Sequence, residues 1–221
     1  MAAGQGTRVG SSLPKQFIPI RGKMLVEFSL SVFQQHPLIQ EIVMTVPAGF
    51  EMEKVDFLKN KYSKLTDVVT GGAERFQSSW AAVKRFVARH DDVLLLHDAA
   101  RPLLPARVID DLVACLQNAS AAVTALPATD TILQVSPQLM LEKTLKRSEL
   151  YYAQTPQAFK AELLCDCFTK LSAASDFKPT DESGLVAHFH PEIPIHIVQG
   201  DPLNFKVTFP EDVLRVERLC E

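Results

Sequence analysis

Two charged residues follow the most apolar run of the chain, Leu94–Leu96, within the stretch His97-Asp98-Ala99-Ala100-Arg101-Pro102. Open α/β sheets bind ligands at the carboxyl ends of their strands, and a carboxylate there is costly unless it contacts a metal or a cation. Because Mg²⁺ prefers carboxylate and phosphate oxygens, we predict that Asp98 is a magnesium ligand and that Arg101 holds a substrate phosphate. An Asp98–Arg101 ion pair that ends the strand is the structural alternative, and His97 is expected to be a packed strand residue.

The amino-terminal segment is rich in glycine and cations. Gly4-Gln5-Gly6-Thr7-Arg8 begins a loop that Pro14-Lys15-Gln16 closes. Glycines let the backbone approach phosphates and expose N–H donors, and Arg8 and Lys15 would add positive charge where a triphosphate binds. The segment matches neither the Rossmann pattern, whose third glycine is replaced by Val9, nor the Walker pattern. A flexible glycine-rich terminus is the alternative interpretation.

Three further loops carry candidate residues. Gly71-Gly72 lies between a predicted strand and a predicted helix, and Ser78 falls near the positive end of that helix; a plain turn is the alternative. Lys206 stands between apolar residues and either enters a cleft or extends to solvent. Thr180-Asp181-Glu182 is typical of a helix start, and Thr180 is a candidate for presenting its hydroxyl to the cleft.

These candidates supply several cations and one or two carboxylates, all after predicted strands. Phosphoryl transfer needs such a set, because it depends on positioning and charge neutralisation rather than covalent catalysis. The sequence has no Gly-x-Ser-x-Gly motif and no His/Cys cluster with zinc spacing.

Short apolar runs alternate with amphipathic stretches, which predicts a mostly parallel sheet covered on both faces. The predicted strands are Glu41–Val46, Thr66–Thr70, Asp92–His97, Ala121–Leu126 and Ile193–Val198. The predicted helices are Leu25–Gln35, Glu51–Tyr62, Glu74–Arg89, Pro105–Asn118 and a last helix that begins at Pro210.

Two segments depart from this alternation. Residues Asp130–Tyr152 alternate apolar and polar side chains around a Ser136-Pro137 turn, which predicts a β-hairpin arm. A two-stranded arm is marginal alone, so we expect it to pack against another copy of the protein. The glycine-rich loop follows only Met1–Ala3, whereas such loops usually follow a strand of about five residues. We therefore expect a trimmed or misassigned amino terminus, since a missing central strand leaves two neighbours unpaired.

Composition narrows the class of protein. The chain has 221 residues, a net charge of −3, 47% hydrophobic residues and four cysteines without a Cys-x-x-Cys pair. These values predict one α/β domain over residues 1–221, with reduced thiols. The charge does not favour a nucleic-acid partner. No apolar run reaches the ~20 residues that span a bilayer, and no signal peptide is evident, so we expect a cytoplasmic protein without a membrane partner.

Seven motifs in order resemble the 2-C-methyl-D-erythritol 4-phosphate cytidylyltransferase family, from Ala2 to Asp212. They are Ala-Ala-Gly-x-Gly-x-Arg, Pro-Lys-Gln, Gly-Gly-x-x-Arg, His-Asp-Ala-Ala-Arg-Pro, Ala-Gln-Thr-Pro-Gln, Thr-Asp-Glu and Lys-Val-Thr-x-Pro-Glu-Asp. The resemblance implies a three-layer Rossmann-like nucleotidyltransferase fold of the α/β class, with a mostly parallel mixed sheet and a protruding β-arm. It also implies transfer of CMP from CTP to 2-C-methyl-D-erythritol 4-phosphate with release of pyrophosphate, with Mg²⁺ as cofactor.

The resemblance further assigns roles to residues. Arg8, Lys15 and Lys206 would neutralise the triphosphate and the transition state, and Asp98 would help to place magnesium or the substrate. The residues implied to contact CTP are Ala2, Ala3, Gly4, Gly72, Ser78 and Ala99. The residues implied to line the substrate side are Arg101, Thr131, Arg147, Thr155 and Thr180. Since Thr131 and Arg147 lie on the arm, which in this family reaches into the partner's active site, the resemblance implies a homodimer.

Some features leave alternatives open. Ala73 stands where the family often has an acidic residue, so nucleotide selectivity is in question. Ribitol 5-phosphate cytidylyltransferases share the fold and chemistry, although Thr144–Arg147, Ala153–Thr155 and Ala100 favour the methylerythritol enzyme. A dinucleotide-dependent dehydrogenase is disfavoured by the broken glycine pattern and the many cations. A non-catalytic scaffold is supported only by the nearly absent first strand.

Overall fold

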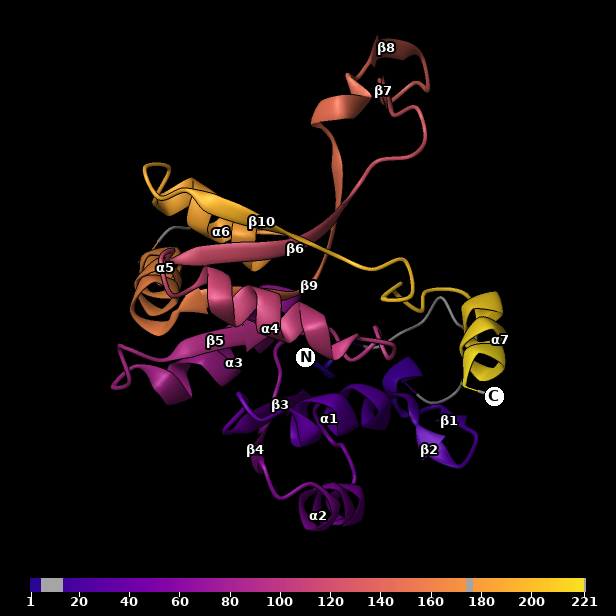
Figure 1. The fold of residues 1–221 in the computed structure, drawn as a ribbon, viewed down its shortest axis with the longest axis vertical. Coiled ribbons are helices and arrows are strands. Elements are labelled where there is room, and N and C mark those ends of the chain that lie inside the picture. Colours follow the sequence, from indigo (N-terminus) through magenta and orange to yellow (C-terminus); the bar gives the residue numbers. More distant parts are fainter. Residues whose placement is uncertain (5–13, 174–176, 221) are drawn as a thin grey trace.

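Short Val-, Ile- and Leu-rich runs form the central layer of a three-layer α/β fold, and amphipathic helices cover both faces (Figure 1). The computed structural model describes residues 1–4, 14–173 and 177–220. The central strands are β3 (Ile42–Val46), β4 (Leu65–Thr70), β5 (Val93–Leu96), β6 (Ala121–Pro127), β9 (Tyr151–Lys160) and β10 (Ile195–Gln199). A small hairpin of β1 (Pro19–Ile20) and β2 (Lys23–Met24) lies outside this layer.

The six central strands form two sheets, which the first residues of the chain connect. One sheet has the order β10-β6-β9-β5, and the other pairs β3 with β4. β10 is parallel to β6, β3 is parallel to β4, and β9 is antiparallel to both β5 and β6. The first residues of the chain connect the two sheets, because Ala2 N donates to Thr45 O at 2.9 Å and Ala99 N donates to Met1 O at 3.0 Å.

The helices form the two outer layers. They are α1 (Leu25–Gln35), α2 (Met52–Lys61), α3 (Arg75–Val83), α4 (Ala106–Cys115), α5 (Ala161–Ala173), α6 (Glu182–Phe189) and α7 (Pro210–Leu219). Leu94 and Leu96 pack with α3, α5 and α6, whereas Val93 and Leu95 pack with α1 and α4. This alternation explains the continuous apolar run of β5, since both faces of the strand are covered.

The predicted elements are confirmed with small changes at their ends. The Leu25–Gln35 helix has its predicted bounds, but the predicted Glu74–Arg89 helix is shorter, because α3 ends at Val83 and a 3₁₀ turn, η3 (Lys84–Phe86), follows. Asp181 caps α6 by accepting a hydrogen bond from Gly184 N at 2.8 Å. Strand β9 was not predicted, because its Gln154-Thr155-Pro156 core does not resemble a central strand.

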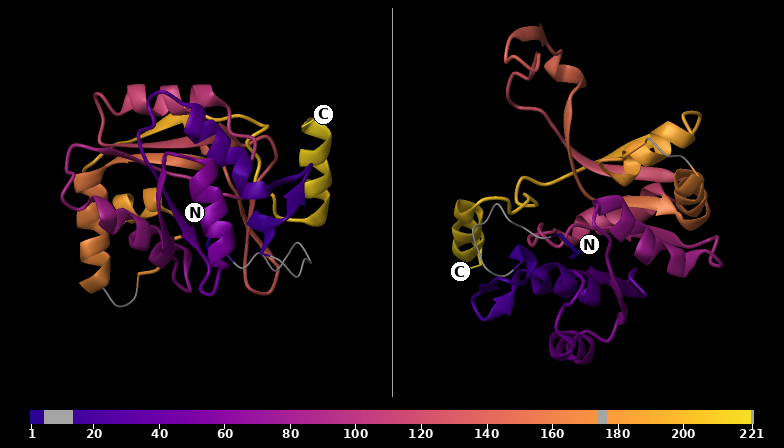
Figure 2. Two further views of the ribbon diagram at one scale, coloured as in Figure 1. Left: turned by 90° about the horizontal axis from the view of Figure 1, so that it is seen from below. Right: turned by 180° about the vertical axis from the view of Figure 1, so that it is seen from behind.

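The predicted β-arm is confirmed as a hairpin that leaves the body of the molecule. β7 (Leu133–Val135) pairs with β8 (Leu141–Thr144), and the 3₁₀ turn η4 (Arg147–Glu149) leads back to β9. The arm stands away from the other layers in front and rear views (Figures 1 and 2). Within the described part of the chain, none of the helices is long and apolar enough to span a bilayer.

Candidate active site

A cavity of about 600 Å³ opens beside the carboxyl ends of β3, β4 and β5. This cavity, called the cleft below, is bounded by the amino-terminal segment, the turn after β4, the end of β5 and the segment before α7. The predicted residues that line it are Ala3, Gly4, Lys15, Gly72, Ser78, Asp98 and Lys206. The fold therefore gathers residues from both ends and the middle of the chain at one edge of the sheet, as expected for an open α/β protein.

Asp98 lies at the centre of the charged groups. Its Oδ2 accepts a hydrogen bond from Lys206 Nζ at 2.7 Å, and its Oδ1 lies 3.5 Å from the Arg75 guanidinium. Burial acts to raise the pKa of Asp98, but Lys206 and Arg75 outweigh that effect and hold this pKa well below its usual range. Asp98 is therefore a carboxylate throughout the physiological pH range, and it fixes both cations at the cleft.

Arg75 forms an ion pair with the buried carboxylate of Glu182, on the side away from the cleft. Its Nη1 donates to Glu182 Oε1 at 2.7 Å, and the same oxygen accepts from Ser79 Oγ at 2.5 Å. The Glu182 side chain is 1% exposed, so Arg75 joins a carboxylate of the interior to Asp98 at the cleft. Sequence reasoning missed both residues as site residues. A signal was present, because an arginine in the first turn of a helix faces an unfavourable dipole and needs an acidic partner.

The two lysines reach the cleft from segments that are held together by main-chain contacts. Lys15 Nζ donates to Val207 O at 2.8 Å, next to Lys206. Gln16 Nε2 donates to Ala2 O at 2.5 Å and to Gly4 O at 2.8 Å, and the Gln16 side chain is buried. Gln16 thus fixes the start of the glycine-rich segment beside the cations.

The turn after β4 requires glycine at both positions. A Cβ on Gly71 would lie 2.3 Å from Ala3 Cβ, and one on Gly72 would lie 2.3 Å from Gln77 Cβ. Gly72 N donates to Ser78 Oγ at 3.1 Å, which ties the turn to the first turns of α3. Gly72 and Ser78, each implied by the resemblance to contact CTP, therefore lie together, and the turn packs against the amino-terminal segment.

We expect Gly71→Ala to lower the free energy of unfolding by about 1–3 kcal/mol, the usual cost of forcing an extra methyl group into a packed site. The new Cβ at position 71 would also lie 2.6 Å from Ser78 Oγ, so it would clash on two sides. Urea denaturation measures the loss. Gly4→Ala is the matched control, since a Cβ at Gly4 meets nothing within 4 Å; equal effects of the two substitutions would contradict the packing argument.

Thr155 and His97 fix the main chain of Asp98. Thr155 Oγ1 accepts from Asp98 N at 3.0 Å. His97 Nε2 lies 3.0 Å from Arg101 O, which can only accept, so Nε2 carries the proton of the neutral ring. Nδ1 is then the acceptor, and the Thr155 hydroxyl donates to it at 3.1 Å. Burial lowers the pKa of His97 to about 4, so the imidazole is neutral at pH 7.

This neutral His97 gives an expected pH dependence of stability. Below pH 6.5 the unfolded chain binds a proton at His97 that the folded chain excludes until about pH 4, so the stability contribution falls as pH falls through this window. Between pH 6 and pH 4 we expect a loss of about 2 kcal/mol. Urea denaturation at both pH values checks it, and His97→Gln should show a smaller pH-dependent loss. An equal loss in the variant would assign the effect to other groups.

Arg101 is held by main-chain carbonyl groups rather than by Asp98. Its guanidinium donates to Asn204 O at 2.8 Å and to Ala153 O at 3.1 Å, and Lys206 and Arg75 contact Asp98 in its place. The alternative Asp98–Arg101 ion pair is therefore wrong. Arg101 instead anchors the segment that carries Lys206. Its Nε is buried without a hydrogen-bond partner, which leaves a donor for a further acceptor.

The remaining predicted residues lie outside the cleft of the described chain. Ala2 and Ala99 are buried beneath it, and Thr180 is exposed on the segment before α6. Thr131 and Arg147 are exposed on the arm, where Arg147 Nη1 donates to Thr129 O at 3.1 Å. Arg8 lies outside the described residues.

The comparisons with known proteins identify the family of the chain. A family model described as 2-C-methyl-D-erythritol 4-phosphate cytidylyltransferase matches residues 1–221. The enzyme of that name from Symbiobacterium thermophilum is 38% identical over 220 residues, which cover 100% of this chain and 90% of the relative. The one from Thermobifida fusca is 36% identical, covering 99% and 90%.

One relative carries a different name. The bifunctional ribulose 5-phosphate reductase/CDP-ribitol pyrophosphorylase Bcs1 of Haemophilus influenzae is 34% identical, covering 100% of this chain and 47% of the relative. Among solved structures, the 4-diphosphocytidyl-2C-methyl-D-erythritol synthase of Anaerococcus prevotii matches with a TM-score of 0.82 and 26% identity, covering 99% of this chain and 94% of that chain. Fold, cleft and similarity over the whole length agree: the chain belongs to the 2-C-methyl-D-erythritol 4-phosphate cytidylyltransferase family.

Proposed function

We propose that this protein transfers CMP from CTP to 2-C-methyl-D-erythritol 4-phosphate, giving 4-diphosphocytidyl-2-C-methyl-D-erythritol and pyrophosphate. The observation that carries the proposal is a cleft lined by Lys15 and by Lys206 and Arg75, which both contact Asp98, beside a glycine turn at the carboxyl ends of the strands. Such a group binds a triphosphate and neutralises the charge that develops during phosphoryl transfer.

The chemistry requires little beyond positioning. A phosphate oxygen of the sugar-alcohol phosphate attacks the α-phosphorus of CTP in line, the α–β phosphoanhydride bond breaks, and pyrophosphate leaves. A phosphate monoester is already anionic near pH 7, so no general base is needed. Lys206 Nζ, held at 2.7 Å from Asp98, is placed to stabilise the negative charge on the α-phosphoryl group.

The residues fit magnesium only together with the nucleotide. Among the described residues, His, Cys, Asp and Glu side chains form no cluster of three that holds a metal unaided. Mg²⁺ at nucleotide sites is bound by one or two carboxylates, substrate phosphates and water. Asp98 is the carboxylate that would hold it here, and the ion would supply further neutralisation of the triphosphate.

Pyrophosphate release tests the proposed function. We expect release that requires CTP, Mg²⁺ and 2-C-methyl-D-erythritol 4-phosphate together. A parallel assay with ribitol 5-phosphate should give a much lower kcat/KM. Preference for ribitol 5-phosphate would assign the alternative substrate, and the absence of release with either acceptor from folded protein would reject cytidylyl transfer.

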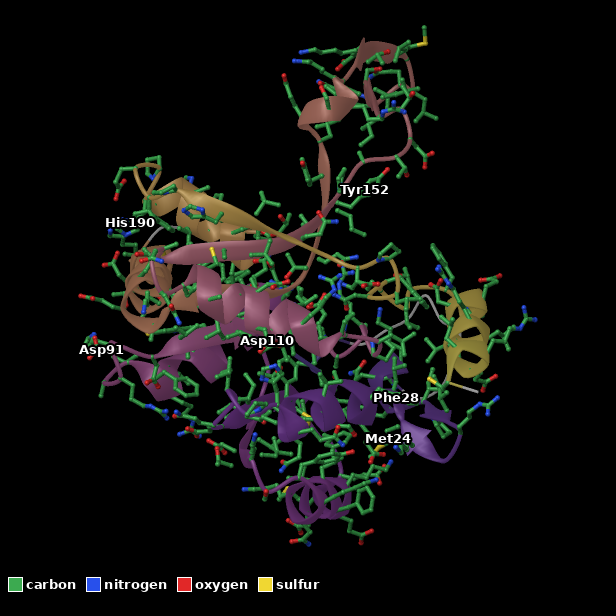
Figure 3. All side chains as sticks on the ribbon, viewed as in Figure 1. Met24, Phe28, Asp91, Asp110, Tyr152 and His190 are labelled. Carbon is green, nitrogen blue, oxygen red and sulfur yellow. The ribbon has the colours of Figure 1, made fainter. Side chains whose placement is uncertain are left out.

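We further propose that the protein acts as a homodimer through the arm. Leu139, Met140 and Leu141 at its tip are 83%, 67% and 61% exposed, and Tyr151 and Tyr152 are also exposed. Tyr152 lies at the base of the arm (Figure 3). Apolar groups gathered on a thin hairpin favour contact with a second surface. Since Thr131 and Arg147 lie on the same arm, dimerisation would bring them to the cleft of the partner subunit.

We expect Met140→Ser/Leu141→Ser to weaken the dimer at least about tenfold, because each exposed apolar group contributes roughly 1 kcal/mol or more when buried at an interface. Sedimentation equilibrium measures the dissociation constant. Leu214→Ser is the matched control. Leu214 is also an exposed leucine, at 54%, but it belongs to α7 and not to the arm. A monomer in every variant and in the parent protein would contradict the proposal.

A further inference from the structure

The segment between β10 and α7, residues 200–209, carries Lys206 to the cleft (Figure 1). The structure describes all of this segment, and it forms neither a helix nor a strand. It contains one turn, in which Asn204 N donates to Asp201 O at 3.0 Å and Leu203 N donates to Asp201 Oδ1 at 2.9 Å. Because no regular element holds this segment, the position of Lys206 depends on contacts between the segment and the sheet.

Gln154 of β9 holds the beginning of the segment. Its Nε2 donates to Asp201 O at 2.9 Å, and its Oε1 accepts from Asp201 N at 3.2 Å. These two contacts determine the orientation of the Gln154 amide, since the nitrogen meets a carbonyl oxygen and the oxygen meets an N–H group. Gln154 is 6% exposed, so the contacts are shielded from water.

Asn204 holds the middle of the segment from the protein interior. It is 0% exposed, and its Nδ2 donates to Thr155 O at 2.8 Å and to Gln154 Oε1 at 3.3 Å. Asn204 Oδ1 is also buried and has no hydrogen-bond partner among the described residues. An unpaired buried polar atom is costly, so the side-chain contribution of Asn204 comes from its N–H donors.

Thr155 connects Asn204 with the carboxylate of the cleft. Its Oγ1 accepts from Asp98 N at 3.0 Å, and its main-chain oxygen accepts from Asn204 Nδ2 at 2.8 Å. Asp98 and the segment of Lys206 are therefore fixed to the same residue of β9. Lys206 lies two residues after Asn204, and its Nζ donates to Asp98 Oδ2 at 2.7 Å. The hydrogen bond of Asn204 thus sets the position of the ammonium relative to the carboxylate.

The main chain around Asn204 joins a third part of the molecule. Arg101 Nη1 donates to Asn204 O at 2.8 Å, and Arg101 Nη2 donates to Ala153 O at 3.1 Å. Val207 N donates to Ala100 O at 2.8 Å. Asn204 therefore lies where the segment, β9 and the residues that follow β5 meet, and a shift of its side chain would be passed on to Lys206.

We propose that Asn204 is a positioning residue for cytidylyl transfer, which holds Lys206 beside Asp98 through its two side-chain hydrogen bonds. The role rests on the proposed function, because it concerns the rate of that reaction. Asn204 is not among the residues that line the cleft, so its effect on the reaction passes through Lys206. Displacing a catalytic group by about 1 Å can lower a rate about 10²-fold, which makes this position sensitive to small changes.

Asn204→Asp tests the role. The substitution keeps the shape of the side chain but replaces the donor nitrogen with an oxygen, which would face Thr155 O and Gln154 Oε1. We expect kcat for pyrophosphate release to fall about 30-fold and KM for CTP to change less than about threefold. Asn204→Ala, which removes the donors without adding a charge, should give the same pattern if Asn204→Asp folds poorly.

The same substitution in a Lys206→Met protein separates positioning from a general loss of structure. If Asn204 acts through Lys206, Asn204→Asp should lower the residual kcat of Lys206→Met by less than about twofold. Partial unfolding would instead lower kcat by the same factor in both proteins. Equal factors in the two proteins would therefore overturn the proposal.

Glu27→Gln is the matched control. Glu27 is also a buried polar residue, at 2% exposed, and the substitution also exchanges an amide and a carboxylate of the same shape. Its partners are Lys61 Nζ at 2.6 Å and Tyr62 OH at 3.1 Å, at the end of α2. We expect a lower Tm but a kcat within about twofold of the parent value. A fall in kcat as large as that of Asn204→Asp would overturn the proposal.

The distance between Lys206 Nζ and Asp98 Oδ2 provides a readout without catalysis. It is 2.7 Å in the present structure, and we expect more than about 4 Å in a crystal structure of Asn204→Asp, beyond the range of an ion pair. An unchanged distance would overturn the role of Asn204 whether or not the protein is active. The absence of pyrophosphate release from the parent protein, together with the longer distance in the variant, would reject the proposed function alone.

Discussion

Lys206→Met is expected to lower kcat for cytidylyl transfer by about 10²–10³-fold, the effect of removing one preorganised donor from a transition-state site. Lys206 Nζ lies 2.7 Å from Asp98 Oδ2, so the carboxylate holds the cation at the cleft before the nucleotide binds. Methionine keeps most of the side-chain volume and removes the charge. Steady-state kinetics of pyrophosphate release measures the change.

The fold should tolerate this substitution, since the Lys206 side chain is 40% exposed. Lys206→Arg separates charge from geometry: it keeps the positive charge but presents a planar fork in place of a point charge, so we expect partial activity. Lys54→Met is the control, because Lys54 forms only a surface pair with Glu51, and its kcat should be unchanged. A kcat for Lys206→Met within threefold of the parent value would remove Lys206 from the mechanism.

The sequence predicted helices and strands most accurately where the apolar periodicity matches the burial of the side chains. The apolar spacing of Leu25–Gln35 gave the bounds of α1, and the run Leu94–Leu96 identified the central strand β5. Strand β9 was missed because Thr155 and Pro156 resemble a loop, whereas the buried side chain of Thr155 is used to hold Asp98 and His97. Tertiary hydrogen bonds there override local preference.

The residues of the candidate site also make contacts that the sequence alone did not predict. The chemical types of Asp98 and Lys206 were predicted, but their 2.7 Å contact spans 108 positions, and only the family resemblance implied that they meet. Glu182 was interpreted as part of a helix start. That interpretation is correct, because Asp181 caps α6 and Glu182 is its first residue, but it did not predict that the Glu182 side chain extends to Arg75, a partner 107 positions away. Local spacing carries no information on contacts of this kind.

The sequence places only three residues before the glycine-rich segment, and the first two of them form hydrogen bonds with both sheets. Met1 and Ala2 keep the hydrogen bonds that a strand would make at its carboxyl end, with His97 O and Thr45 O. These contacts connect β3 with the end of β5, so the floor of the cleft is formed beside the Asp98–Lys206 pair.

Glu182→Ala is expected to lower the free energy of unfolding by up to about 3–5 kcal/mol, because it leaves the partly buried Arg75 cation without its closest partner. The Arg75 guanidinium, 28% exposed, would lose its 2.7 Å contact, and the Ser79 hydroxyl would lose the closer of its two acceptors. Urea denaturation measures the loss. Glu162→Ala is the matched control, since Glu162 also lies in the first turn of a helix but is exposed, and its effect should stay within about 0.5 kcal/mol.

The double variant Arg75→Met/Glu182→Met distinguishes a structural ion pair from one that serves the cleft. Replacing both charges with apolar groups removes the unpaired ion, so much of the stability lost in Glu182→Ala should return. The rate of pyrophosphate release should nevertheless stay low, because Arg75 lines the cleft 3.5 Å from Asp98 and no longer supplies positive charge. Recovery of both stability and kcat would limit the pair to a structural role. Recovery of stability alone would show that the interior carboxylate is retained to hold Arg75 at the site of phosphoryl transfer.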